Sequence, residues 1–161
     1  MDSRKIAYCA LLSAVALLLG YVERLLAVPM VVPGMKLGLA NVVVLLALYL
    51  FDAKTALGIS LVRILLSGFV FTGFASFLYS GAGAMLSFLA MAAFQKTKRF
   101  SMVYVSIIGG MSHNIGQMIF ACIAVENIRL LYYLPILLVI GGATGFLTGI
   151  VGEKTIGYLK Y

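Results

Sequence analysis

Residues 100–125, FSMVYVSIIGGMSHNIGQMIFACIAV, form a stretch without a single charged side chain. A helix needs about 20 mostly apolar residues to cross the roughly 30 Å hydrocarbon layer of a bilayer, and this stretch exceeds that length. Further uncharged runs cover residues 6–22, 37–51, 64–95 and 130–152. The chain is therefore expected to be an all-α integral membrane protein embedded in a lipid bilayer.

The composition argues against several other classes of protein. Of 161 residues, 63% are hydrophobic and 11% are charged, against about 25% charged residues in a typical soluble domain. The net charge of +7 does not predict a nucleic-acid partner, because Lys and Arg punctuate the apolar runs instead of clustering among polar residues. Five acidic residues are too few for most hydrolases, calcium sites or aspartate-rich prenyl transferase centres. We expect a protein that is not catalytic by itself.

The run at residues 64–95 is long enough for parts of two crossings, and the motif SGAG at residues 80–83 predicts a break within it. We therefore predict one domain of six transmembrane helices, at about residues 5–22, 36–51, 54–78, 82–96, 101–124 and 132–152.

Lys and Arg set the predicted orientation, because they favour the cytoplasmic side of a membrane. With six crossings, the side of the termini carries Arg4, Lys5, Lys54, Lys96, Lys98, Arg99, Lys154 and Lys160, and the other side carries Arg24, Lys36 and Arg129. Both termini are predicted to be cytoplasmic, in the inner (cell) membrane of a bacterium or archaeon. The apolar loop at residues 23–36 is predicted to fold back as a lid over the helices, with anchoring in the headgroups as the alternative.

Small residues at four-residue spacing allow helix backbones to approach closely in lipid. Ala10 and Ala14 form one such ridge near the N-terminus, and Gly141, Gly145 and Gly149 form a second ridge. Each ridge can serve packing within the protein or docking of a partner helix.

Six polar side chains inside or next to the predicted helices need a reason, because an unsatisfied polar group at bilayer depth is costly. They are Lys36, Asn41, Arg63, His113, Asn114 and Gln117. The set is rich in donors and poor in acids, and Arg63 and Lys36 would suit a carboxylate or phosphate. The sequence thus predicts a ligand pocket, although Arg63 snorkelling to the cytoplasmic headgroups and a structural His113 remain alternatives. With one His and two distant Cys, neither a metal nor another cofactor is expected.

Four segments carry a resemblance to a known family. They are PGMKLGLANVVVLLAL at residues 33–48, RILLSG at 63–68, SGAGAMLSFLAM at 80–91 and GGMSHNIGQM at 109–118. Together they resemble the Gx transporters, many of which are labelled heptaprenyl diphosphate synthase component I.

That family more distantly resembles the substrate-binding S components of energy-coupling factor (ECF) transporters. The resemblance implies a six-helix bundle with cytoplasmic termini and an outer pocket closed by the loop after the first helix. It also implies that Ala10 and Ala14 dock onto a transmembrane coupling subunit driven by two ATPases.

Two functions remain open on the sequence. The first is the S component of an ECF-type ABC importer, which captures a small anionic or amphipathic, vitamin-like or isoprenoid-related molecule at the outer face. The second is a non-catalytic membrane accessory subunit of polyprenyl (heptaprenyl) diphosphate or quinone synthesis, whose partner would be a soluble prenyl diphosphate synthase. The only aspartates, Asp2 and Asp52, are too far apart in the sequence to form the paired magnesium site of a synthase.

Overall fold

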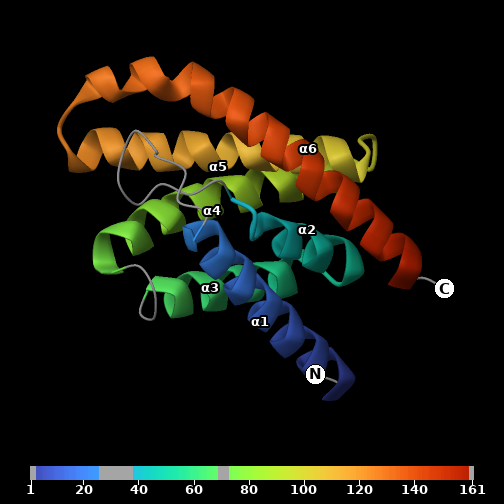
Figure 1. The fold of residues 1–161 in the computed structure, drawn as a ribbon. Coiled ribbons are helices and arrows are strands. Elements are labelled where there is room, and N and C mark those ends of the chain that lie inside the picture. The colour runs from blue at the N-terminus through green and yellow to red at the C-terminus, as the bar shows by residue number, and fades with distance from the viewer. Residues whose placement is uncertain (1–2, 26–37, 69–72, 160–161) are drawn as a thin grey trace.

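The computed structural model describes residues 3–25, 38–68 and 73–159 of the chain, and these residues form helices and turns without any strand. The elements are α1 (Ser3–Leu25), α2 (Asn41–Leu50), α3 (Ala53–Ser67), α4 (Gly73–Lys96), α5 (Met102–Ala124), the 3-10 helix η2 (Ile128–Tyr133) and α6 (Leu134–Leu159). Figure 1 shows their arrangement as a bundle. The predicted lid at residues 23–36 falls largely outside the described residues.

Four of the described helices are long and apolar enough to cross a membrane, over Lys5–Glu23, Phe77–Lys96, Met102–Ala124 and Ile128–Leu159. Their outer surfaces carry large exposed apolar side chains such as Leu18 and Val139. Contact of these side chains with lipid is favourable, whereas contact with water is not. The chain is therefore a multi-pass membrane protein. Helix α2 has 10 residues and α3 has 15, so neither is as long as a straight full crossing, and six crossings remain a prediction.

The predicted helix break at residues 80–83 is wrong. Residues 80–83 lie inside α4, which runs without interruption from Gly73 to Lys96, and α3 ends at Ser67, earlier than predicted. A Cβ added at Gly83 would lie 2.8 Å from the carbonyl oxygen of His113. The missing side chain of Gly83 thus lets α4 approach α5, and this tertiary contact outweighs the low helix propensity of glycine.

The start of the second helix also differs from its prediction. Residues 38–40 form a turn, and α2 begins at Asn41 instead of near residue 36. Gly38 has a φ of +88°, a conformation that residues with a side chain rarely adopt. This glycine therefore allows the turn at residues 38–40 that leads into α2.

Helix α5 packs against α4 on one side and α6 on the other (Figure 1). The glycine ridge of α6 makes the second contact: a Cβ added at Gly145 would lie 2.6 Å from the Ser106 carbonyl oxygen, and one at Gly141 would lie 2.7 Å from the Gly110 carbonyl oxygen. The ridge of Gly141, Gly145 and Gly149 is thus used for packing within the protein.

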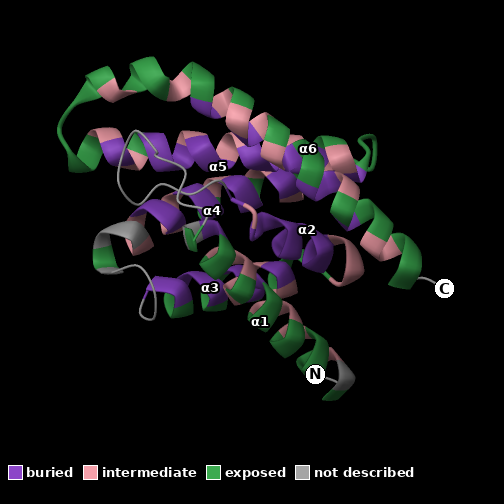
Figure 2. Cartoon of the chain, viewed as in Figure 1, coloured by how far each residue is buried: buried purple, intermediate pink, exposed green. Residues whose placement is uncertain are grey.

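Helix α2 is the centre of the bundle. Every residue from Asn41 to Leu48 is buried, and Figure 2 shows α2 as the buried element between outer helices whose surfaces are exposed. It contacts α1, α3, α4, α5 and α6. Its sequence is apolar on all sides because all of its sides face other helices.

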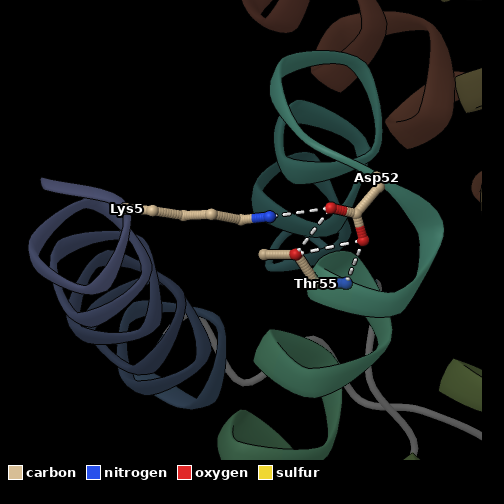
Figure 3. A network of polar contacts seen from close by, with 3 residues as sticks. All are labelled: Lys5, Asp52 and Thr55. Atoms are coloured by element: carbon tan, nitrogen blue, oxygen red, sulfur yellow. Dashed lines mark hydrogen bonds and ion pairs between the residues drawn. The ribbon is translucent and has the colours of Figure 1, made fainter. Parts of the chain in front are cut away.

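A polar network joins the start of α1 to the turn between α2 and α3 (Figure 3). Lys5 Nζ lies 2.8 Å from Asp52 Oδ2. Asp52 is also the N-cap of α3, and its Oδ1 accepts a hydrogen bond from the backbone N–H of Thr55 at 2.8 Å. The N-terminal end of α1 and the α2–α3 turn therefore lie at the same end of the bundle.

Candidate ligand-binding site

Polar groups from four helices meet around Gly38, at the entrance to α2. The Gly38 N–H donates to the carboxylate of Glu23, which lies in the last turn of α1. A Cβ added at Gly38 would lie 3.1 Å from Asn41 Nδ2 and 3.2 Å from His113 Cδ2. Asn41 in turn donates to the Ser87 hydroxyl of α4 at 3.2 Å.

Helix α5 supplies the imidazole and an amide of this site. His113 and Gln117 are one turn apart, both are buried, and His113 Nε2 lies 3.0 Å from Gln117 Nε2. Gly83 of α4 lies directly against both side chains. We call Glu23, Asn41, Ser87, His113 and Gln117 the polar cluster; the structure thus brings together the predicted residues Asn41, His113 and Gln117.

Arg63 lies within electrostatic range of the polar cluster: the carboxylate of Glu23 acts on the charge of its guanidinium. Arg63 is only 7% exposed, so other groups of the protein cover its side chain. The helix that carries it ends at Ser67, which places Arg63 near the C-terminal end of α3 and not near its beginning. The burial and this position both argue against the snorkelling alternative.

The guanidinium of Arg63 has an unused binding edge. Its Nε and Nη2 atoms are buried and have no hydrogen-bond acceptor among the described residues. These two nitrogens lie on the same edge of the planar group, the edge that grips a carboxylate or phosphate with two parallel hydrogen bonds. Arg63 can therefore bind an oxyanion through this edge without breaking a hydrogen bond to the described residues.

Asn114 lies on a different face of α5 from His113. Its amide donates to the Leu137 carbonyl oxygen of α6 at 2.6 Å, and it also lies against Gly141. In this arrangement Asn114 joins α5 to α6. The remaining predicted ligand residue, Lys36, lies outside the described residues.

Two buried serines of α4 were missed by the sequence reasoning. Ser80, Gly83 and Ser87 recur at i, i+3 and i+7, so they lie on one face of the helix. This spacing was the available signal, but the predicted break at residues 80–83 concealed it. Glu23 was placed in the outer loop by prediction and is a buried residue of α1. Among the described residues, no three His, Cys, Asp or Glu side chains are placed to hold a metal ion.

The family model of heptaprenyl diphosphate synthase component I matches residues 12–155. The chain belongs to this family. No curated protein and no solved structure matches the chain. The family's name describes one component of a synthase, and therefore points to a second component as a partner.

An open groove lies between α1 and α3. On α1 it lies toward the N-terminus, away from Glu23, and on α3 it extends to Val62, which directly precedes Arg63. The groove has a volume of about 530 Å³ and is lined by Ile6, Cys9, Ala10, Ser13, Lys54, Thr55, Gly58, Ile59 and Val62. Ala10 and Ala14 are both exposed. Small side chains on an exposed helix face leave room for the backbone of another helix.

Proposed function

We propose that this component I family member is a ligand-binding membrane subunit that captures a small anionic or amphipathic molecule and passes it to a partner. The observation that carries the proposal is the unused, buried edge of Arg63 beside the polar cluster. A buried guanidinium without acceptors is costly in a membrane protein unless a ligand completes its hydrogen bonds. The ligand is thus expected to carry a carboxylate or phosphate.

The surrounding groups would orient the rest of the ligand. Asn41, His113 and Gln117 supply neutral donors and acceptors next to Gly38. Asn114 and Lys36 remain predicted ligand residues, the first at the α5–α6 contact and the second outside the described residues. The charge of Glu23 offsets that of Arg63, which reduces the cost of an arginine in the empty site.

The predicted orientation would place this site on the outer side. Glu23 and Arg63 lie near the C-terminal ends of their helices, and Asn41 begins α2. With both termini cytoplasmic, these ends lie in the outer half of the bilayer, and the ion pair of Lys5 and Asp52 lies at the cytoplasmic side. Ligand would enter from outside.

Delivery to the cytoplasm would need a partner that supplies energy. We assign this role to a transmembrane coupling subunit with two ATPases, as in ECF-type importers, and we place its docking surface at Ala10 and Ala14. The exposure of both alanines and the groove beside Ala10 support this placement. Gly58, on the opposite wall of the groove, would allow the partner helix to approach α3 as well.

A second function is favoured by the family's name. As a non-catalytic accessory subunit of heptaprenyl diphosphate or quinone synthesis, the protein would use the same Arg63 edge for a prenyl diphosphate or related compound. A soluble synthase would bind at the cytoplasmic side, where Lys96, Lys98 and Arg99 are exposed in the turn between α4 and α5.

Native mass spectrometry of the purified full-length protein tests the binding function. Wild type should retain a small molecule with a carboxylate or phosphate, and Arg63→Gln should lose it. The double variant Glu23→Gln with Arg63→Gln removes both buried charges together, so it controls for a folding defect caused by one unpaired charge. Retention of the same molecule by a folded double variant would contradict the assignment of Arg63.

Affinity purification separates the two functions. Recovery of two ATPases and a transmembrane subunit would support the importer, whereas recovery of a prenyl diphosphate synthase without ATPases would support the accessory subunit. The charge-removing variant Lys96→Gln with Lys98→Gln and Arg99→Gln should reduce recovery only in the second case.

A further inference from the structure

The Ser80 hydroxyl is an exception among the buried hydroxyl groups of the helices. Ser80 is 4% exposed, and its Oγ has no hydrogen-bond partner among the described residues. Elsewhere the buried Ser67 hydroxyl donates to the Ile64 carbonyl oxygen at 3.2 Å, and Ser106 lies 3.0 Å from the Thr148 hydroxyl. The predicted site did not include Ser80, and the family match assigns it no role.

The register of α4 places Ser80 on the side of the ligand site. Ser80 shares a helix face with Gly83 and Ser87. On that face Gly83 lies against His113 and Gln117, and Ser87 accepts a hydrogen bond from Asn41. The side chain of Ser80 therefore extends from the same face, one turn closer to the N-terminal end of α4.

A buried hydroxyl without a partner destabilises a protein, because it gives up its hydrogen bonds to water and gains none in return. Two buried groups of donors lack a hydrogen-bond partner among the described residues. They are the Nε and Nη2 edge of Arg63 on α3 and the Ser80 hydroxyl on α4. Both groups would be satisfied by a ligand that carries several acceptor oxygens.

We propose that Ser80 is a ligand-contacting residue that donates its hydroxyl to an oxygen of the same head group that Arg63 grips. This assignment rests on the proposed ligand-binding function and narrows the ligand to an oxyanion held from two helices. Phosphate and carboxylate share this chemistry. Ser80 and Arg63 then select a head group whose oxygens reach α3 and α4 together.

The test compares Ser80→Ala with Ser106→Ala in the full-length protein purified in detergent. Both serines are 4% exposed, but Ser106 has a partner in Thr148. Titration calorimetry with sodium pyrophosphate and sodium butyrate measures affinity for the two classes of oxyanion, and a thermal scan without either probe measures stability. Arg63→Lys, which keeps the charge and loses the two-nitrogen edge, is measured in parallel.

We expect Ser80→Ala to weaken binding of whichever probe the wild type binds by about 10-fold or more, since a hydrogen bond to a charged group is lost. Without a probe, its melting temperature should equal or exceed that of the wild type, because a hydroxyl without a partner has been removed. Ser106→Ala should show the opposite pattern, with a lower melting temperature and unchanged affinity. Ser80→Thr, which restores the hydroxyl, should recover part of the affinity.

The outcomes separate this inference from the function on which it rests. If Arg63→Lys loses affinity while Ser80→Ala binds like the wild type, the oxyanion site stands and the role of Ser80 is wrong. A drop in melting temperature for Ser80→Ala, equal to that of Ser106→Ala, would also overturn it. If neither probe binds the wild type, or Arg63→Lys binds as well as wild type, the oxyanion site fails and the inference fails with it.

Discussion

Asp52 performs two tasks with one carboxylate. Its oxygens accept hydrogen bonds from Lys5 and from the backbone N–H and hydroxyl of Thr55 (Figure 3). These hydrogen bonds hold the pKa of Asp52 well below its ordinary value. The bond from Lys5 has the largest effect, and those from Thr55 add to it. The side chain of Asp52 is 50% exposed, so its contribution to stability is sensitive to salt.

This lowered pKa predicts a pH dependence. The folded protein favours the charged carboxylate, so the stabilisation from Asp52 is complete above the unfolded pKa of about 4 and is lost as the pH falls through the lower folded pKa. The melting temperature of Asp52→Asn should therefore lie below that of wild type at pH 7, and the gap should close as the pH falls below about 4. Thermal scans of both proteins in detergent, at a series of pH values, measure the difference in melting temperature.

Two further variants divide the effect of Asp52 into its parts. Asn can still cap a helix, so Asp52→Asn removes chiefly the pairing with Lys5, whereas Asp52→Ala also removes the cap of α3. Lys5→Gln should reproduce the smaller loss. A gap between wild type and Asp52→Asn that is the same at pH 3 and pH 7 would contradict the assignment.

Asn114 provides a second prediction for a single residue. Because its amide donates to the Leu137 carbonyl oxygen of α6, Asn114→Ala should lower the free energy of unfolding by about 0.6–1.7 kcal/mol, the range for a hydrogen bond between membrane helices. Affinity for an oxyanion probe should change less than in Gln117→Ala. A variant with unchanged stability and lost binding would show that Asn114 acts on the ligand.

At the scale of elements, the contact between α5 and α6 depends on positions without side chains. Gly110 and Gly141 face each other: a Cβ added at Gly110 would lie 2.1 Å from the Gly141 carbonyl oxygen. At this distance an added methyl group would clash, so a side chain fits at Gly110 only if α5 and α6 move apart. Van der Waals packing, rather than the hydrophobic effect, drives helix association in lipid, so separation removes its main source of free energy.

Adjacent glycines of α6 give a matched test of this contact. A Cβ added at Gly141 would lie 2.6 Å from Asn114 Nδ2 and 2.7 Å from the Gly110 carbonyl oxygen, whereas one at Gly142 would meet only Met111 Cγ, at 3.9 Å. Gly141→Ala should therefore cost about 1–3 kcal/mol of unfolding free energy. Gly142→Ala should be neutral or stabilise by up to about 1 kcal/mol, because alanine favours the helix. Equal effects in denaturant titrations would contradict the tight α5–α6 contact.

At the scale of the whole molecule, the polar cluster and the groove occupy different parts of the bundle. The cluster lies around the entrance to α2, and the groove runs between the N-terminal half of α1 and residues 54–62 of α3. Both involve α1 and α3: Glu23 lies near the end of α1 opposite the groove, and on α3 the groove residue Val62 directly precedes Arg63. Occupancy of the proposed ligand site and docking of the proposed partner can thus influence each other through these two helices.

The proposed docking surface can be blocked without disturbing the interior. Ala10 and Ala14 are exposed, so Ala10→Leu with Ala14→Leu should leave the melting temperature and ligand affinity close to those of the wild type. Capture of the coupling subunit should fall about tenfold for each 1.4 kcal/mol of docking free energy lost. Ala143→Leu, an exposed position on α6, is the control. Unchanged capture and uptake by the double variant would remove the docking role.

The sequence by itself determined the class of protein and most of its long helices. The uncharged run at residues 100–125 became α5, Met102–Ala124, within two residues of its predicted limits. Solvation in lipid depends on the apolar content of a continuous segment, which can be read directly from the chain. The grouping of Asn41 with His113 and Gln117 was also predicted, because few polar residues occur at that depth and they need one another.

Tertiary structure alone decided which neighbour each of these residues meets. SGAG at residues 80–83 remains helical because Gly83 meets the backbone of α5, and no local pattern contains that contact. The position of Arg63 on α3 brings its guanidinium within electrostatic range of Glu23, and the rotation between adjacent residues of a helix directs Asn114 to α6 and His113 to Gly38 and α4. Composition determines that a segment is buried in the membrane, whereas the partner of a buried polar group depends on how the helices pack.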